Sequence, residues 1–195
     1  MLSPAAKRLS TVNPNHLSAI SLVFALLAGI LFALDREHFL LLAAVAVALN
    51  GFFDALDGKV ARISSKASKR GDFVDHVIDR YADVLIIGGI ALSPHCPVWI
   101  GLLAMIGVLL ASYMGTQSQA LGLSRDYRGI LGRADRLMLL IVVPIAQYAL
   151  VLADQVSIAE DLFGLSLVAW TMVYFALAGN VTALQRAYKT WQSLG

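Results

Sequence analysis

Charged side chains are scarce in this sequence of 195 residues: Asp, Glu, Lys and Arg make up 14% of it, while 58% is hydrophobic. A soluble domain of this size carries about 25% charged residues. The shortage argues against a set of buried helices in a soluble protein. Cysteine is almost absent as well, and the single Cys96 excludes an intrachain disulfide and fits no zinc-binding pattern.

Long apolar runs stand where charges are missing. A membrane-spanning helix needs about 20 mostly apolar residues, and six segments meet this length, two of them with polar ends. We therefore expect an all-α integral membrane protein with six transmembrane helices, a single domain over residues 1–195, and a short interfacial helix within Met1–Val12. The predicted spans are Leu17–Leu34, Phe39–Ala61, Gly71–Leu92, the part of Val84–Ser124 that follows a break at Ser93–Pro97, Leu137–Ala153 and Leu162–Gln185.

Basic residues sort to one side of these spans. With six crossings, 14 of the 15 Lys and Arg residues fall on the side that also holds both termini, and Arg36 is alone on the other. Because basic residues collect in cytoplasmic loops, this distribution predicts a multi-pass protein of the cytoplasmic membrane with both termini in the cytoplasm.

Eight residues in one short stretch form the pattern D-x2-D-G-x2-A-R-x8-G-x3-D-x3-D. Asp54 and Asp57 share one face of a helix, and Asp75 and Asp79 share one face of the next. Antiparallel packing can bring the four carboxylates together, where they would suit a hard divalent cation. The eight residues are Asp54, Asp57, Gly58, Ala61, Arg62, Gly71, Asp75 and Asp79.

Three interpretations of these acids compete. They could form structural ion pairs with Arg62, Lys69 and Arg80, although carboxylates at membrane depth are usually functional. They could form an ion or proton pathway in a cation-binding transporter, but their position beside a basic loop at one membrane face argues against it. They could also bind a metal for phosphoryl chemistry, in which a carboxylate takes the proton from an attacking hydroxyl.

The eight residues resemble the signature of the CDP-alcohol phosphotransferases at every fixed position. The resemblance implies transfer of a phosphatidyl or archaetidyl group from a CDP-linked lipid to a hydroxyl, with release of CMP and with one or two Mg²⁺ or Mn²⁺ ions. It implies that Asp79 is the general base and that a homodimer forms; no nucleic-acid partner is expected. The implied metal ligands are Asp54, Asp57, Asp75 and Asp79, and the implied CDP-lipid contacts are Gly58, Arg62, Ser68, Asn15 and Ser18.

The acceptor is indicated by a second resemblance, to the phosphatidylinositol-phosphate synthases of this family. The segment Gly132–Leu137 is similar to their E-R-x-E-R-L sequence, and Gln185-Arg186 is similar to the Q-R of their last helix. This implies that Arg136, Arg186 and, with less support, Arg133 bind the phosphate of inositol phosphate. Arginine suits this role because its planar fork matches phosphate, although basic residues at cytoplasmic helix ends are also expected from topology alone.

One stretch departs from those synthases, and other acceptors stay open. After Ser112-Tyr113, Gly115 and Gln117 stand where the synthases usually carry basic residues. Glycerol phosphate and serine are therefore alternative acceptors for the same chemistry. The general look of the sequence is archaeal, which would make the donor CDP-archaeol and the product archaetidylinositol phosphate.

Overall fold

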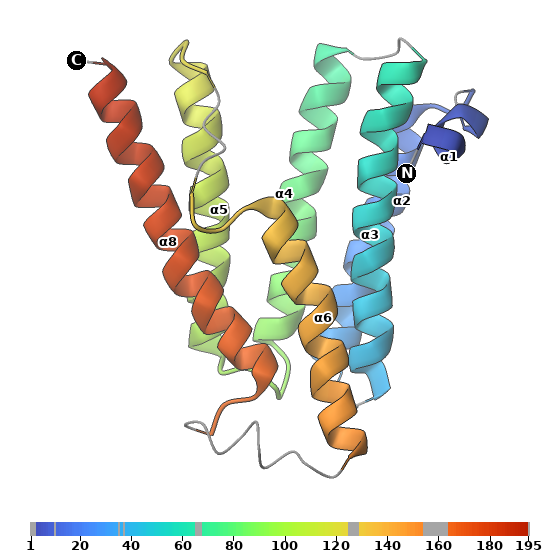
Figure 1. Cartoon of the computed structure of the whole chain (residues 1–195), viewed down its shortest axis with the longest axis vertical. Coiled ribbons are helices and arrows are strands. Elements are labelled where there is room, and N and C mark those ends of the chain that lie inside the picture. Colours follow the sequence, from blue (N-terminus) through green and yellow to red (C-terminus); the bar gives the residue numbers. More distant parts are fainter. Residues whose placement is uncertain are drawn as a thin grey trace.

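The computed structural model describes residues 3–9, 11–34, 36, 38–64, 68–124, 129–153 and 164–194. All regular secondary structure in these ranges is helical, as expected. A short helix precedes six long ones that run along the bundle in Figure 1. The helices are α1 (Ser3–Arg8), α2 (Pro14–Ala33), α3 (His38–Ile63), α4 (Lys69–Ala91), α5 (Val98–Ala120), α6 (Arg133–Leu152) and α8 (Leu167–Leu194).

Five of these helices are long and apolar enough to cross a membrane: α2, α3, α5, α6 and α8. Their outward faces carry large apolar side chains, such as Leu26, Leu102 and Leu177, which are 46%, 49% and 65% exposed. The protein is therefore a multi-pass membrane protein. Helix α4 falls short because charged residues occupy its first half, so the expected count of six spans is not confirmed and stays a prediction for α4.

Local capping explains where the site-bearing helices begin. The Asn13 side chain accepts a hydrogen bond from the Asn15 N–H at 3.1 Å, and Pro14 occupies the first turn of α2. Ser68 caps α4 in the same way by accepting from the Gly71 N–H at 3.1 Å. These caps fix the ends of α2 and α4 that meet at the site.

Small residues set the distances between the packed helices. Helix α2 packs against α3 and α4, α5 packs against α8, and α6 contacts both α3 and α8. A Cβ atom on Gly29 of α2 would collide with the Leu85 carbonyl of α4, and one on Gly89 would collide with the backbone of Gly29. Such close approach without intervening side chains is typical of helix contacts in membranes.

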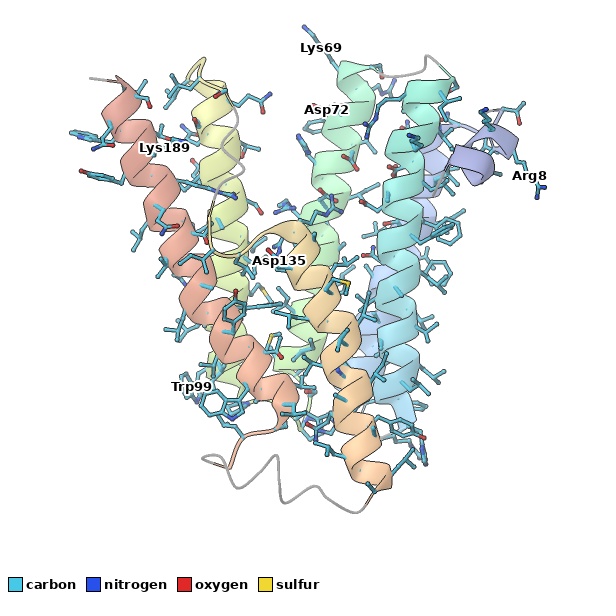
Figure 2. All side chains as sticks on the ribbon, viewed as in Figure 1. Arg8, Lys69, Asp72, Trp99, Asp135 and Lys189 are labelled. Atoms are coloured by element: carbon cyan, nitrogen blue, oxygen red, sulfur yellow. The ribbon has the colours of Figure 1, made fainter. Side chains whose placement is uncertain are left out.

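Helix α6 begins inside the bundle and not at its end. Figure 1 shows α6 starting at mid-height between α4 and α8, and Figure 2 places Asp135 there, well below Lys69 and Lys189. Asp135 accepts a hydrogen bond from the Gly132 N–H at 3.1 Å, which stabilises the start of this helix. The predicted start at Leu137 was about one turn late, and Arg133 and Arg136 consequently belong to the first helical turn.

Candidate functional site

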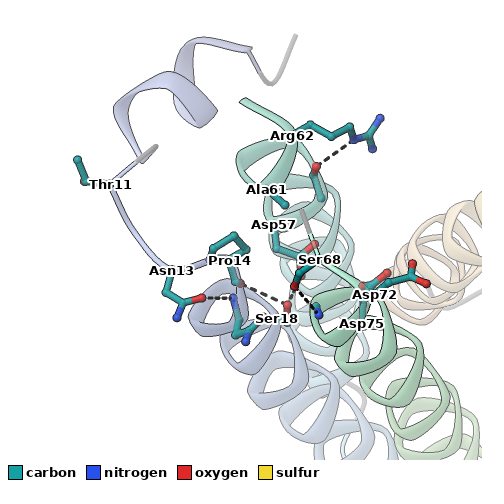
Figure 3. Close-up of a pocket in the computed structure, with 13 residues that line it drawn as sticks. Thr11, Asn13, Pro14, Ser18, Asp57, Ala61, Arg62, Ser68, Asp72 and Asp75 are labelled. Carbon is teal, nitrogen blue, oxygen red and sulfur yellow. Dashed lines mark hydrogen bonds between the residues drawn. The ribbon is translucent and has the colours of Figure 1, made fainter. Parts of the chain in front are cut away.

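A cleft of about 560 Å³ opens where the ends of α2, α3 and α4 meet (Figure 3). It brings together all five residues that the sequence assigns to the CDP-linked lipid, and two of the predicted metal ligands. The predicted residues that line it are Asn15, Ser18, Asp57, Gly58, Arg62, Ser68 and Asp75.

Asp57 is held in this cleft by Ser18. The Ser18 hydroxyl lies 2.5 Å from Asp57 Oδ2 and 3.3 Å from the Pro14 carbonyl, so its proton is donated mainly to the carboxylate. Asp57 is only 4% exposed. A hydroxyl donor stabilises a buried carboxylate and fixes its orientation, which leaves Asp57 Oδ1 as the oxygen not engaged by Ser18.

Two glycines of the motif keep side chains out of the cleft. A Cβ on Gly71 would lie 3.3 Å from Ser68 Oγ and 4.0 Å from Asn15 Oδ1, so a larger residue would crowd both polar groups. A Cβ on Gly58 would lie 3.6 Å from Arg62 Nη2. Arg62 Nε donates to the Gly58 carbonyl at 3.0 Å, which places the guanidinium over this glycine at the cleft wall.

Arg133 joins the other two acids from across the bundle. Its Nη2 atom lies 2.6 Å from Asp54 Oδ1 and 2.5 Å from Asp79 Oδ1, and its Nη1 donates to Asp79 Oδ2 at 2.8 Å. One nitrogen therefore contacts oxygens of two carboxylates, a position comparable to that of a bridging cation. The guanidinium offsets the repulsion between these acids.

Two of the four predicted metal ligands, Asp75 and Asp79, are close enough to share a cation, together with His76, which was not singled out from the sequence. Ligand atoms of Asp75, His76 and Asp79 lie within 4.8 Å of one another, and Asp79 shares Arg133 with Asp54. Asp57 approaches from the cleft side and Asp54 from the α6 side. This donor set fits a hard divalent ion such as Mg²⁺ or Mn²⁺, for which carboxylate oxygens are the preferred ligands.

The three predicted acceptor arginines have different surroundings. Arg133 binds the acids, as described, and Arg136 Nη1 lies 3.3 Å from Asp83 Oδ2. Both line a small cavity of about 20 Å³ next to Asp79 and Asn50. Arg186 Nη1 instead donates to the Ala111 carbonyl of α5 at 2.6 Å. The structure thus brings Arg133 and Arg136 to the predicted base, and the acceptor role of all three residues stays a prediction.

Two other residues of this region were not identified from the sequence. Asp83 lies one turn after Asp79, and the four-residue spacing that links Asp75 to Asp79 could have identified it. Thr182 of α8 is fully buried and accepts hydrogen bonds from the Ile130 and Leu131 N–H groups at 3.1 Å each. It anchors the loop that leads into α6, and no local pattern marks it because its partners are about 50 positions away.

The fold and the acidic cleft define a membrane protein with a polar site inside a helical bundle. Residues 11–182 match the CDP-alcohol phosphatidyltransferase family, and the chain belongs to this family. It is therefore a transferase of phospholipid synthesis, as the motif predicted.

Individual relatives agree with this assignment. The chain is 34% identical over 131 residues to the archaetidylinositol phosphate synthase of Pyrococcus horikoshii, an alignment that covers 67% of this chain and 68% of the relative. It shares its fold with the phosphatidylinositol phosphate synthase of Mycobacterium tuberculosis at 23% identity. The structure of that enzyme with CDP-DAG bound has a TM-score of 0.76 and covers 98% of this chain and 94% of the other. A second structure of it, with manganese and citrate, has a TM-score of 0.76 and covers 98% and 89%.

Proposed function

We propose that this protein transfers the lipid-linked phosphate group of a CDP-linked lipid to a hydroxyl of inositol phosphate, with release of CMP. The observation that carries the proposal is the convergence of the motif on one region. Its glycines, Arg62, Asp57 and Asp75 line a cleft, Asp79 lies close to Asp75, and Arg133 joins Asp79 to Asp54. The similarity to the archaetidylinositol phosphate synthase of Pyrococcus horikoshii supports inositol phosphate as acceptor and archaeol as the lipid part of the donor.

The nucleotide is assigned to the cleft around Asn15, Ser18, Gly58, Arg62 and Ser68. Glycines leave space for it, and Arg62 supplies positive charge for the pyrophosphate. The Ser68 side chain and the backbone N–H groups at the start of α4 add polar contacts that favour binding of an anion. The lipid part of the donor would remain in the bilayer beside the bundle.

Asp54, Asp57, Asp75 and Asp79 would hold one or two Mg²⁺ or Mn²⁺ ions, and the manganese in the mycobacterial structure supports a divalent ion. When bound, such ions supply positive charge that neutralises the pyrophosphate and the leaving group. Asp57 fits this role because Ser18 fixes one oxygen of its carboxylate and not the other. Asp75 and Asp79 come from successive turns of α4 and can serve a shared ion.

Asp79 takes the proton of the acceptor hydroxyl. The hydroxyl oxygen forms a bond to the lipid-linked phosphorus, the bond from that phosphorus to the oxygen of CMP breaks, and CMP leaves with the electron pair. Asp79 is 6% exposed, which limits competition from water at the base. Arg133 and Arg136, which lie beside Asp79, would bind the acceptor phosphate.

The site would lie on the cytoplasmic side of the membrane. Lys69 and Lys189 are near the same end of the bundle, whereas Trp99 is near the opposite end (Figure 2). The basic end fits the cytoplasmic face. A homodimer, as implied by the family, remains a prediction.

CMP release tests the proposed function. Purified protein would be given Mn²⁺, a CDP-linked lipid with archaeol or diacylglycerol chains, and inositol phosphate, glycerol phosphate or serine. We expect CMP with inositol phosphate, and more with the archaeol donor. Release of CMP with glycerol phosphate alone, or with serine alone, would support the reaction but identify a different acceptor. The uncharged Gly115, which stands where the synthases usually carry a basic residue, would then explain why inositol phosphate is not used. Absence of CMP with every pair would contradict the proposed function.

A further inference from the structure

Asp83 is a carboxylate outside the eight-residue motif that lies next to the predicted base. It comes one helical turn after Asp79, on the same face of α4. Its Oδ2 atom lies 3.3 Å from Arg136 Nη1 of α6 and 3.1 Å from Arg80 Nη1 of its own helix. The side chain is 22% exposed. Asp83 is therefore a second carboxylate, after Asp79, that links α4 to the start of α6.

Arg136 depends on this contact for its place in the bundle. Its side chain is 9% exposed, and Asp83 is its ion-pair partner among the described residues. A guanidinium that is buried without a carboxylate loses hydration that nothing replaces. Arg80 and Arg133 also act on Arg136 and repel it, so without Asp83 only the weaker attraction of Asp79 would oppose this repulsion.

The contact also leaves Arg136 able to bind something else. A guanidinium has five N–H donors, and a single Nη1–Oδ2 contact of 3.3 Å uses one of them at long range. Asp83, Arg136, Asp79 and Asn50 all line the same small cavity. Asp83 can thus hold Arg136 beside Asp79 without consuming the donors that an acceptor phosphate needs.

We propose that Asp83 is a positioning residue for the acceptor, which holds Arg136 beside Asp79 with N–H groups left to bind the acceptor phosphate. This rests on the proposed function, since it assumes that a phosphorylated acceptor binds there. Asp83 touches neither the donor cleft nor the predicted nucleotide contacts. Its effect should therefore fall on acceptor binding and act through Arg136.

A double-mutant cycle with Asp83→Asn and Arg136→Ala tests this positioning role. Steady-state CMP release would be measured for wild type, both single variants and the double variant, with inositol phosphate and CDP-lipid varied in turn. We expect Asp83→Asn to raise the KM for inositol phosphate at least tenfold and to leave the KM for CDP-lipid within twofold. The double variant should match Arg136→Ala within twofold if Asp83 acts through Arg136, whereas an effect that persists without Arg136 would point to the Asp83–Arg80 contact instead.

Asp72→Asn is the matched control, since it removes the same charge from the same helix. Asp72 lies at the rim of the donor cleft, and its side chain is 70% exposed. The KM for inositol phosphate should stay within twofold in this variant, whatever happens to the KM for CDP-lipid. If Asp83→Asn does not fold, Asp83→Glu keeps the charge but displaces it by one bond length, and should raise the acceptor KM at least threefold.

The outcomes separate this inference from the proposed function. If wild type releases no CMP with inositol phosphate, the proposed acceptor is wrong, and the positioning role for that acceptor fails with it. If wild type is active but Asp83→Asn changes both KM values equally, or the effects of the two substitutions simply add, Asp83 has only a structural role and the inference is wrong.

Discussion

Arg133 contacts Asp54 and Asp79, which are two of the proposed metal ligands, and we therefore expect the guanidinium and a divalent ion to compete for these carboxylates. The perturbation is Arg133→Ala, which removes the three short contacts to these carboxylates. In the wild type, a metal ion can bind both acids only after the guanidinium has left them. We expect the variant to bind Mn²⁺ more tightly in the absence of both substrates.

The magnitude follows from the contacts and their exposure. Charge-assisted hydrogen bonds contribute about 1.5–3 kcal/mol each when buried. The Arg133 side chain is 44% exposed, so solvent screening reduces this considerably. We take about 1–2 kcal/mol for the whole contact, which corresponds to about fivefold to thirtyfold tighter binding of the metal. Removing a positive charge from beside the ion acts in the same direction.

The assay is a titration of purified protein with Mn²⁺, followed by electron paramagnetic resonance of the free ion, without CDP-lipid. Lys189→Ala is the control because it removes one positive charge from the far end of α8, as Figure 2 shows. Its affinity for Mn²⁺ should equal that of the wild type. Equal or weaker binding by Arg133→Ala would refute the competition and would mean that Arg133 supports the metal site.

Three further predictions concern packing and the loop before α6. Gly89→Ala should lower the melting temperature by several degrees because its Cβ collides with Gly29. Gly88→Ala should not lower it, because its Cβ would lie 3.4 Å from a flexible Met105 side chain. Equal melting temperatures for the two variants would contradict the close contact of α2 and α4. Thr182→Val removes the acceptor of two backbone N–H groups and should cost about 2 kcal/mol or more, which thermal unfolding would reveal. Burial raises the pKa of the Cys96 thiol to about 11, so maleimide should label it slowly at pH 7 in the native protein and quickly after denaturation; fast native labelling would contradict this burial.

Local patterns in the sequence were sufficient to predict most of the fold. The spans predicted at Phe39–Ala61 and Gly71–Leu92 agree within two residues with α3 and α4, since apolar runs and caps are local signals. The last helix was misjudged at its end: α8 continues to Leu194, well past the predicted Gln185. Charged residues end an apolar run, but a helix that leaves the membrane continues through them.

The candidate site was predictable as a set of residues but not as an arrangement. Asp54 and Asp57 were expected on one helix face, yet Asp54 contacts Arg133 of α6 while Asp57 contacts Ser18 of α2. Residues three positions apart are separated by about 60° around a helix, which is enough for their side chains to contact two different neighbouring helices. Which helix lies on each side of α3 depends on helix packing, and the spacing within the motif does not predict it.

Metal-dependent CMP release by wild type and Asp79→Asn tests the central claim most directly. With Mn²⁺, CDP-archaeol and inositol phosphate, the wild type should release CMP, and removal of the metal with EDTA should abolish the release. Asp79→Asn should still bind CDP-lipid but turn over at least about a hundredfold more slowly, since it lacks the base. Turnover of this variant at the wild-type rate, or release of CMP without metal, would contradict the account.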